Sequence, residues 1–364
     1  MSTAIYIESE ALQSATLPEL VEAVSVSVIV PCYNEERFIG KALANLAEQY
    51  WPENYEIIVV DGMSDDRTRE VIEEFQQAHP DLSIRLLDNP ERNIPHALNR
   101  GIAAAGGEII ARMDAHAAPS SGYIRRCVEV LSEGNAAVVG MPCRVRPGAD
   151  TVMARAIAIA VSHPFGIGDA KYRLGTDLEM SETQEEVDTV AFACFRKSLW
   201  SELDGYDEEL LTNEDYDFNY RARAGGGRVV LDRLAHCDYF ARPTLAKLAS
   251  QYFRYGAWKA RMIHRRPGSI KLRHMVAPVF VASVALLAAA GFWVGFAWQM
   301  LGLELATYLT AALFFSFQAA RNNRGESSLL LIMPAVFFAI HFSWGTSFLW
   351  GLVTPKGHNK RASR

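Results

Sequence analysis

Two side chains that can bind a metal stand two residues apart, directly after an apolar run. Asp114 and His116 follow the segment 108–111. In an extended backbone, side chains at i and i+2 lie on the same face, so these two can converge on one ligand. Carboxylate and imidazole both bind divalent cations such as Mg²⁺ or Mn²⁺. The alternative is a strand-end turn in which Asp114 accepts hydrogen bonds from backbone amides.

A second acidic cluster, 61–66, also follows an apolar run. Ser64, Asp65 and Asp66 have the composition of a helix start, where a capping side chain and negative charge are favoured. Asp61 lies before that start, at the end of the predicted strand. It is therefore better placed to accept a hydrogen bond from a ligand.

A third cluster, Glu214 and Asp215 with Asp217 nearby, opens a predicted helix. Acidic residues are common in the first turn of a helix, which is one interpretation. A carboxylate that faces the same cleft as Asp114 could instead deprotonate an attacking hydroxyl group. The catalytic interpretation predicts that Asp215 lies beside Asp114.

The three clusters follow segments that alternate between strand and helix patterns. We predict strands at 26–30, 56–60, 83–87, 108–111, 187–194 and 228–231, helices at 35–50, 67–78, 97–105, 153–161 and 196–203, and a loop at 165–186. This alternation predicts an α/β fold with a mainly parallel sheet that is covered on both faces. Ligands of such sheets bind beyond the carboxyl ends of the strands, where the polar clusters 31–35, 61–66 and 114–116 fall.

Charge divides the chain into two unlike parts. Of its 364 residues, 1–238 hold 21 Lys+Arg and 40 Asp+Glu, a net of −19, whereas 239–364 hold 15 and 2, a net of +13; together these give −6. The length suggests about two domains. Because the basic part is also the apolar part, it indicates a membrane as the partner and argues against nucleic acid.

Three stretches, 275–303, 305–320 and 327–355, contain no Asp, Glu, Lys or Arg. About 20 apolar residues suffice for a helix to cross the bilayer core. The first and third stretches are long enough, and the second, with 16 residues, is marginal. We expect about three transmembrane helices within 275–355, preceded by a basic and aromatic interface segment at 241–274.

The N-terminal arm, 1–25, has no basic region and apolar run of the kind found in signal peptides. The five cysteines form no CxxC pair, which argues against a zinc site and fits a reducing compartment. We therefore expect the part before residue 275 to be cytosolic and the chain to be a multi-pass protein of the inner membrane.

The basic tail, 356–364, conflicts with this topology. The nine Lys+Arg between 239 and 303 favour the cytosolic side, and a hairpin of 276–299 and 302–320 leaves Arg321 and Arg324 there as well. A third crossing then places the tail outside, against the positive-inside rule. We expect three crossings with the tail outside. Re-entry of the last stretch, helped by Pro334 and Gly345, is the alternative.

The clusters together resemble the inverting family 2 glycosyltransferases of the GT-A fold. The matching pieces occur in the order of that family and lie within 26–232, and they are the segments 28–36, 60–68, 99–101, 114–116 and 214–217, with Arg221 and Gly225. Each piece is short, but the ordered set is specific. His116 and the C-terminal apolar helices most resemble the membrane-bound exopolysaccharide glycosyltransferases of the succinoglycan type. The catalytic GT-A domain would cover 26–240.

The resemblance implies roles for individual residues. Pro31, Tyr33 and Glu35 would line the nucleoside pocket, and Asp61 would contact the base. Asp114 would lie near the ribose and the sugar.

Asp114 and His116 would also hold a divalent cation, Mg²⁺ or Mn²⁺, and Asp215 would be the catalytic base. This chain departs from the family where Gly62 follows Asp61 in place of a second acid, and where His116 replaces the second acid of the usual Asp-x-Asp. Imidazole suits Mn²⁺ better than Mg²⁺.

The segment 251–255 resembles the Gln-x-x-Arg-Trp motif of processive polysaccharide synthases, with Tyr255 in place of Trp. The resemblance implies acceptor contacts for Gln251 and Arg254, to which we add Glu214. An amphipathic helix at the membrane interface is the alternative. Three membrane helices are few for a polymer channel, which favours the addition of a single sugar.

The predicted function is therefore inverting transfer of one sugar from a nucleotide-sugar donor to a polyprenyl-diphosphate glycan in cell-surface polysaccharide synthesis. UDP-linked donors are the commonest in the family, and a polysaccharide-assembly complex is a possible partner. A processive synthase and a polyprenyl-phosphate glycosyltransferase are alternatives with the same chemistry. A membrane scaffold that only binds nucleotide sugar is the alternative from another class.

Overall fold

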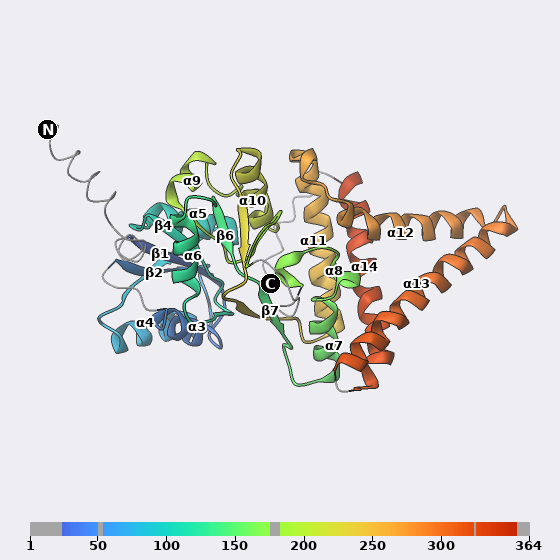
Figure 1. Ribbon diagram of the computed structural model, residues 1–364, viewed down its shortest axis with the longest axis horizontal. Helices are drawn as coiled ribbons and strands as arrows, with labels where there is room; N and C mark the ends of the chain where they lie inside the picture. The colour runs from blue at the N-terminus through green and yellow to red at the C-terminus, as the bar shows by residue number, and fades with distance from the viewer. Residues whose placement is uncertain (1–23, 50–53, 175–182, 324, 355–364) are drawn as a thin grey trace.

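The computed structural model describes residues 24–49, 54–174, 183–323 and 325–354. An α/β part formed by the N-terminal two thirds of the chain adjoins a helical part formed mostly by the last third (Figure 1). Two long helices of the helical part project away from the α/β part.

The α/β part contains an eight-stranded sheet within the described residues, in the order β3-β2-β1-β4-β9-β6-β10-β8. The strands are β1 (Val26–Cys32), β2 (Tyr55–Asp61), β3 (Ser83–Asp88), β4 (Ile109–Arg112), β6 (Val138–Gly140), β8 (Gln184–Glu186), β9 (Cys194–Arg196) and β10 (Val229–Asp232). The strands β3, β2, β1 and β4 are mutually parallel. By contrast, β9 is antiparallel to both of its neighbours, and β8 is antiparallel to β10.

A smaller sheet of three strands has the order β5-β11-β7. Its strands are β5 (Ala117–Pro119), β7 (Cys143–Arg146) and β11 (Cys237–Phe240). Because β5 begins directly after the 114–116 cluster, this sheet holds the cluster between the large sheet and the helical part.

Alternating side chains of the central strands pack into two cores, one on each face of the large sheet. Val28 and Val30 of β1 belong to one core, and Ile29 belongs to the other. The helices that cover the sheet are α3 (Ile39–Ala47), α4 (Thr68–Ala78), α5 (Ile94–Ala104), α6 (Tyr123–Ser132), α9 (Lys197–Glu202) and α10 (Glu214–Ala224). A mainly parallel sheet covered on both faces is the predicted fold class.

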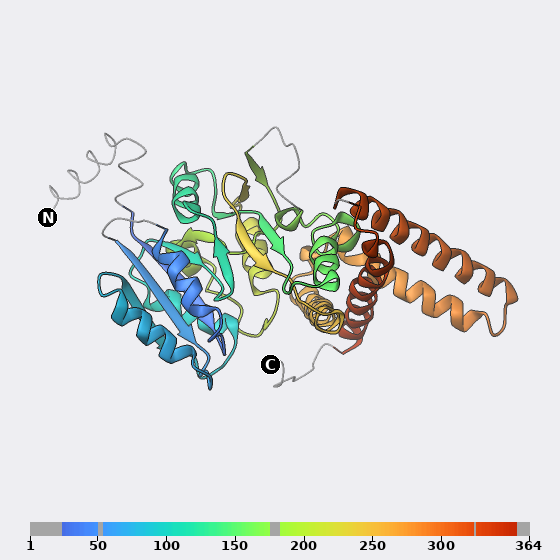
Figure 2. The same cartoon turned by 90° about the horizontal axis from the view of Figure 1, so that it is seen from below.

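The helical part joins two separate regions of the chain. Its elements are α7 (Val152–Ala160), α8 (Pro164–Ile167), η1 (Lys171–Arg173), α11 (Leu245–Arg265), η2 (Pro267–Ser269), α12 (Leu272–Ala290), α13 (Gly295–Asn322) and α14 (Ser328–Val353). The last three are long and apolar enough to cross a membrane. Figure 2 shows α12 and α13 as a hairpin that leaves the rest of the molecule, whereas α14 stays beside α11.

The predicted strand at 187–194 is wrong in its position. The strand is β9, Cys194–Arg196, and the preceding residues leave the sheet. Phe192 has a φ of 50°, which an extended strand does not accommodate. Asn219 donates hydrogen bonds from Nδ2 to Thr189 Oγ1 at 2.9 Å and to the Val190 carbonyl at 3.0 Å. These bonds hold the segment against α10 and not against a neighbouring strand.

Three other expectations differ from the structure. Of the predicted loop at 165–186, residues 175–182 lie outside the described residues, and the rest contains the end of α8, η1 and β8, which pairs with β10. The uncharged stretch 275–303 is broken at 291–294, where α12 ends and α13 begins. The strands β5, β6, β7 and β11 and the helix α6 have no counterpart among the predicted elements.

Candidate active site

A cleft of 1820 Å³ runs from the carboxyl ends of the parallel strands to the membrane-proximal helices. Its lining includes Asp114 and His116 after β4, and Asp215 at the start of α10. Farther along it is lined by Phe280 of α12 and Trp344 of α14. The structure therefore brings Asp114 and Asp215 into one cavity, as the catalytic interpretation predicts.

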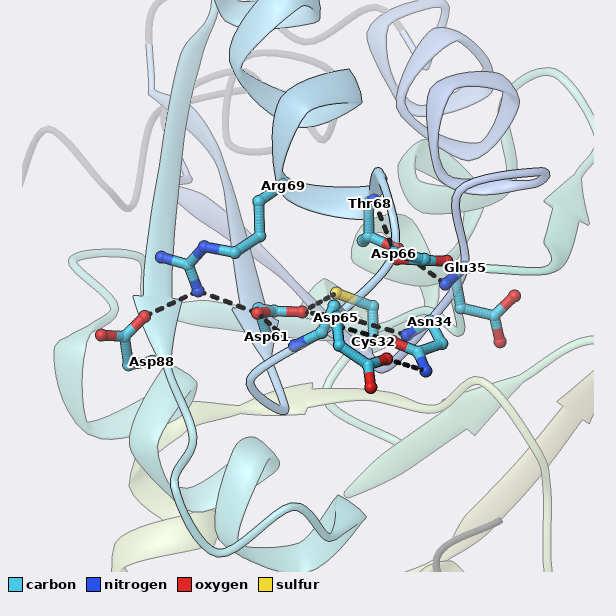
Figure 3. A network of polar contacts seen from close by, with 10 residues as sticks. Cys32, Asn34, Glu35, Asp61, Asp65, Asp66, Thr68, Arg69 and Asp88 are labelled. Carbon is cyan, nitrogen blue, oxygen red and sulfur yellow. Dashed lines mark hydrogen bonds and ion pairs between the residues drawn. The ribbon is translucent and has the colours of Figure 1, made fainter.

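Two loops at one end of the cleft are joined by hydrogen bonds (Figure 3). Asn34, which has a φ of 56°, donates from Nδ2 to Asp65 Oδ1 at 2.6 Å, and the Asp65 amide donates back to Asn34 Oδ1 at 3.0 Å. The Glu35 amide donates to Thr68 Oγ1 at 2.8 Å. The loop after β1 therefore takes its shape from the helix start after β2. We call residues 31–36 and 61–69 the donor-side loops.

Asp61 lies at the centre of the donor-side loops and is fully buried. Its carboxylate accepts hydrogen bonds from the Ser64 amide at 3.0 Å and from Arg69 Nη1 at 2.8 Å, and Arg69 also binds Asp88 at 2.8 Å (Figure 3). The Cys32 thiol donates to Asp61 Oδ1 at 3.7 Å. Asp61 thus stabilises the loop, and its contact with a nucleobase stays a prediction.

The other predicted nucleoside contacts occupy different positions. Tyr33 lines the cleft together with Asn34. Pro31 is buried within β1. Glu35 points its carboxylate at His116, whose Nδ1 lies 3.2 Å from Glu35 Oε1. Glu35 therefore connects the donor-side loops to the predicted metal ligands.

His116 lies in a charged environment. Burial alone would lower the pKa of the imidazole, but the hydrogen bond to Glu35 and the charges of Asp114 and Glu35 outweigh it and raise the pKa. The surroundings of His116 thus favour a bound positive charge, whether a proton or a metal ion.

A divalent cation fits Asp114 and His116 only with ligands from outside the chain. The described residues contain no group of three or more His, Cys, Asp or Glu side chains that could hold a metal. Arg112 donates hydrogen bonds to Asp114 Oδ1 at 3.3 Å. The other oxygen of Asp114, Oδ2, has no hydrogen-bond partner among the described residues. Mg²⁺ sites commonly combine one or two protein ligands with phosphate oxygens and water. Asp114 and His116 therefore fit a cation whose remaining ligands come from a diphosphate and water.

Arg112, at the end of β4, links two of the acidic clusters. Its Nη1 lies 2.9 Å from Glu214 Oε1 and its Nη2 lies 3.3 Å from Asp114 Oδ1, with 7% of the side chain exposed. Burial alone would lower the pKa of Arg112, but the charges of Asp114, Glu214 and Asp215 raise it. We did not predict a role for this residue from the sequence. The signal was an arginine inside an otherwise apolar strand.

The three acidic residues that open α10 have different surroundings. Glu214 is buried against Arg112, and Asp217 is buried with Arg221 at 2.7 Å and Arg266 at 3.3 Å. Asp215 lines the cleft and forms no ion pair within 4 Å among the described side chains. Asp215 Oδ1 accepts a hydrogen bond from the Tyr216 amide at 2.7 Å, and of the three carboxylates that of Asp215 alone has no ionic partner among the described residues. This arrangement suits a general base.

The 251–255 segment lies on α11 and also lines the cleft. Gln251 is buried and donates from Nε2 to the Tyr255 hydroxyl at 2.9 Å and to the Tyr239 hydroxyl at 3.1 Å. It therefore orients two tyrosines on the cleft wall. Arg254 lies on the same wall and has no carboxylate partner within the described part of the chain.

Two further cations on this wall escaped our sequence analysis. Arg173 of η1 lies between the rings of Tyr172 and Tyr239, at 5.4 and 5.3 Å from their centroids. Lys259 of α11 lies 3.3 Å from the centroid of the Tyr216 ring. Neither forms an ion pair with a described carboxylate. Together with Arg254 they make this end of the cleft receptive to anions, and we call the three the unpaired cations.

Comparison with known proteins identifies the α/β part. Residues 27–200 match the family model "Glycosyl transferase family 2". The succinoglycan biosynthesis protein ExoA of Rhizobium meliloti is 28% identical over 88% of this chain and 93% of its own length. A Methanococcus voltae protein is 25% identical over 90% of this chain and 97% of its own length. It is named dolichyl N-acetyl-alpha-D-glucosaminyl phosphate 3-beta-D-2,3-diacetamido-2,3-dideoxy-beta-D-glucuronosyltransferase.

The fold agrees with a solved structure. The mannosyltransferase PcManGT of Pyrobaculum calidifontis, in complex with GDP-Man and Mn²⁺, superposes with a TM-score of 0.58 at 20% identity. The superposition covers 97% of this chain and 93% of that one, so it includes the helical part. The α/β part of this chain is therefore a family 2 glycosyltransferase domain of the GT-A fold, and the protein is a glycosyltransferase.

Proposed function

We propose that the protein transfers one sugar, with inversion, from a nucleotide-sugar donor to a lipid-linked glycan acceptor at the membrane. The observation that carries this proposal is the course of the cleft. It leads from Tyr33 and Asp114, past Asp215, to Phe280 and Trp344 of the apolar helices. An acceptor with a sugar at one end and an isoprenoid chain at the other would match this change of lining.

The donor would bind at the donor-side loops, and a UDP-linked sugar is our first choice. Tyr33 would contact the nucleoside, and the diphosphate would approach Asp114 and His116. A cation bound there would neutralise the charge of the leaving diphosphate. The nucleotide and Mn²⁺ present in the structure of the mannosyltransferase support this assignment.

Asp215 would remove the proton of the acceptor hydroxyl while the hydroxyl attacks the anomeric carbon. A single displacement inverts that carbon and needs one base. Glu214 and Arg112 would hold the start of α10 in place, so that Asp215 faces the sugar. Gln251, through the two tyrosines it orients, and Arg254 would contact the acceptor.

The relatives favour the polysaccharide setting and the lipid-linked acceptor. One carries succinoglycan biosynthesis in its name, and the other acts on a dolichyl-phosphate-linked sugar. From these two names we propose that the acceptor is a polyprenyl-diphosphate glycan in the inner membrane. The catalytic domain would lie in the cytosol. The apolar surfaces of α12 and α13, such as Leu286 (69% exposed) and Phe314 (61%), support membrane insertion.

A donor screen tests the proposal. Purified protein is incubated with single nucleotide sugars and Mn²⁺, with and without a polyprenyl-diphosphate glycan. We expect release of nucleoside diphosphate to depend on the lipid, and the lipid to gain the mass of one sugar. A ladder of products would indicate a processive synthase, and binding without release would indicate a scaffold. If polyprenyl phosphate accepted the sugar better than the polyprenyl-diphosphate glycan, the protein would be a polyprenyl-phosphate glycosyltransferase.

A further inference from the structure

Lys259 is a buried lysine on the wall of the cleft. Only 2% of its surface is exposed, and it contacts the Ser269 carbonyl at 3.4 Å, the Met262 sulfur at 3.6 Å and the face of the Tyr216 ring. It forms no ion pair with any carboxylate that the structure describes. These neutral groups replace the hydration of an ammonium ion poorly.

Such a residue destabilises the fold that contains it. Burial and the nearby charge of Arg273 lower the pKa of Lys259 to about 6, against the pull of Asp188, Asp217 and Asp215. A methionine of similar length would fill the same space without that penalty. Polar groups that destabilise a core without forming a structural pair are typical of functional sites.

The surroundings of Lys259 belong to the membrane end of the cleft. Tyr216, whose ring it contacts, follows Asp215 in the chain, and Ser269 ends η2, which leads into α12. Arg273 at the start of α12 and Trp344 of α14 line the same cavity. Lys259 therefore lies between the predicted catalytic base and the apolar helices. The donor-side loops, in contrast, come from β1 and β2.

We propose that Lys259 binds a phosphate group of the lipid-linked acceptor and thereby positions the acceptor sugar at Asp215. The inference rests on the proposed function. The donor diphosphate offers the same chemistry, and the position of Lys259 beside α12 favours the lipid as the source.

Lys259→Met tests this site, with the exposed Lys271→Met as the matched control. We expect the KM for the polyprenyl-diphosphate acceptor to rise by about 10- to 100-fold, since a hydrogen bond to a charged group is lost. Donor affinity should stay within about twofold in both variants, and the melting temperature of Lys259→Met should equal or exceed that of the wild type. An unchanged acceptor KM, or weaker donor binding alone, would overturn the proposal.

A binding measurement separates this proposal from the proposed transfer. Farnesyl diphosphate and farnesol are compared as ligands in a thermal-shift assay without donor. The wild type should be stabilised by the diphosphate more than by the alcohol, and Lys259→Met should lose the difference. If the wild type shows no difference, the site is wrong even where transfer occurs. If Lys259→Met does not fold, Lys259→Arg, which keeps the charge, should retain the stabilisation.

A second, independent observation concerns α14, which packs along α11 instead of extending away with α12 and α13 (Figures 1 and 2). The two helices run in the same direction and approach closely at glycines. A Cβ at Gly256 would lie 2.3 Å from Ser347, and one at Gly351 would lie 2.8 Å from Ala260. The offset between the residues of α11 and those of α14 is thus the same at both contacts.

Both ends of α14 and its middle contact helices that adjoin the α/β part. Before its first turn, Glu326 pairs with Arg155 of α7 at 2.8 Å. In its middle, His341 Nε2 is 2.8 Å from the Phe165 carbonyl of α8. Its last turn packs on α11, whose Arg265 pairs with Asp207 of the α/β part at 2.7 Å. A helix that crosses a membrane has its ends on opposite sides, so this packing does not suit a crossing.

The opposite face of α14 is apolar and exposed. Leu331 (81% exposed), Phe338 (45%), Trp350 (62%) and Val353 (74%) lie along it at helical spacing. An exposed apolar face marks a surface that contacts lipid, and a helix whose other face is packed on protein can make that contact while lying along the membrane. We infer that α14 lies flat on the cytosolic face of the bilayer and that only the α12–α13 hairpin crosses it.

This topology removes the conflict over the basic tail. The tail 356–364 then stays on the side of Arg321 and the basic residues of α11, and the turn at 291–294 on the other side carries no charge. The 19 residues of α12 are about 28 Å long, close to the roughly 30 Å core of a bilayer. Two crossings with the tail inside therefore replace the three that we expected.

Cysteine labelling in oriented membrane vesicles tests this topology. The five native cysteines are all buried, so an introduced cysteine can be followed. An impermeant maleimide should label Gly295→Cys at the hairpin turn in right-side-out vesicles only, and Lys360→Cys in inside-out vesicles only. If both introduced cysteines were labelled in right-side-out vesicles, α14 would cross the membrane as a third span. Labelling of both from the inside would show that the hairpin does not cross. Either result would overturn the inference.

Discussion

The two ends of the cleft differ in how their charges are paired. In the donor-side loops, Asp61, Arg69 and Asp88 form a chain of ion pairs, and Asn34 and Asp65 bind each other reciprocally. At the membrane end, none of the unpaired cations has a carboxylate partner among the described residues. The first region is assembled before any ligand binds, whereas the second combines Arg273, which pairs with Asp169 and Asp188, with three cationic side chains that lack such partners in the described part of the chain.

This difference indicates how the two substrates would be recognised. A preassembled loop selects a ligand of one shape, which suits a nucleotide. Cations without partners suit a ligand that brings its own negative charge, and the net charge of the membrane-proximal part agrees with this. Asp215 lies between the two regions, and its carboxylate belongs to neither set of pairs.

Replacing Asp215 should have the largest effect. Asp215→Asn keeps the shape and removes the base, so we expect kcat to fall by about 10²- to 10⁴-fold. Donor affinity, measured by nucleotide titration, should change little, because the donor-side loops are intact. Glu214→Gln is an informative comparison, since Glu214 also lines the cleft but its carboxylate pairs with Arg112. Wild-type turnover in Asp215→Asn would remove Asp215 from the mechanism.

Replacing Asp61 should weaken the donor end of the cleft. Asp61→Asn leaves Arg69 with Asp88 alone and disturbs the bond from the Ser64 amide, so we expect a loss of about 1–3 kcal/mol in unfolding free energy. Donor affinity should fall, and acceptor KM should stay near the wild-type value. Glu70→Gln, which breaks an exposed pair with Arg67, should leave the melting temperature unchanged. A stable Asp61→Asn protein would show that the ion-pair chain does not maintain the loop.

Replacing Gln251 should have the smallest effect and act at the other end. Gln251→Leu removes the two hydrogen bonds that orient Tyr239 and Tyr255. A neutral hydrogen bond contributes about 1 kcal/mol, so acceptor KM should rise about fivefold. Donor affinity should be unaffected. A change in donor affinity without a change in acceptor KM would reverse the assignment of the two ends.

The elements with strong local patterns were predictable from the sequence. The strands β1, β2 and β4 contain apolar runs that end at polar clusters, and parallel pairing brings those ends to one edge of the sheet. That Asp215 enters the same cleft as Asp114 was a condition of the catalytic interpretation and did not follow from this rule. The short strands of the small sheet were missed, because three or four residues show too little periodicity to separate strand from loop.

The partners of the site residues were not predictable. Arg112 and Glu214 are far apart in the chain, and only the packing of α10 against β4 brings them together. The same holds for Lys259, which looks like any lysine of an amphipathic helix until Tyr216 and Ser269 are seen packed against it. For Asp61 the sequence indicated an acid free for a ligand, whereas Arg69, in the first turn of α4, forms an ion pair with its carboxylate.

The anomeric configuration of the product tests the central claim most directly. The lipid-linked product of wild-type protein, made with a donor of known configuration, is analysed by NMR for the coupling constant of the new anomeric proton. A single displacement with Asp215 as the base predicts that the transferred sugar is inverted relative to the donor. A retained configuration would require a second nucleophile or a different reaction course and would contradict the account.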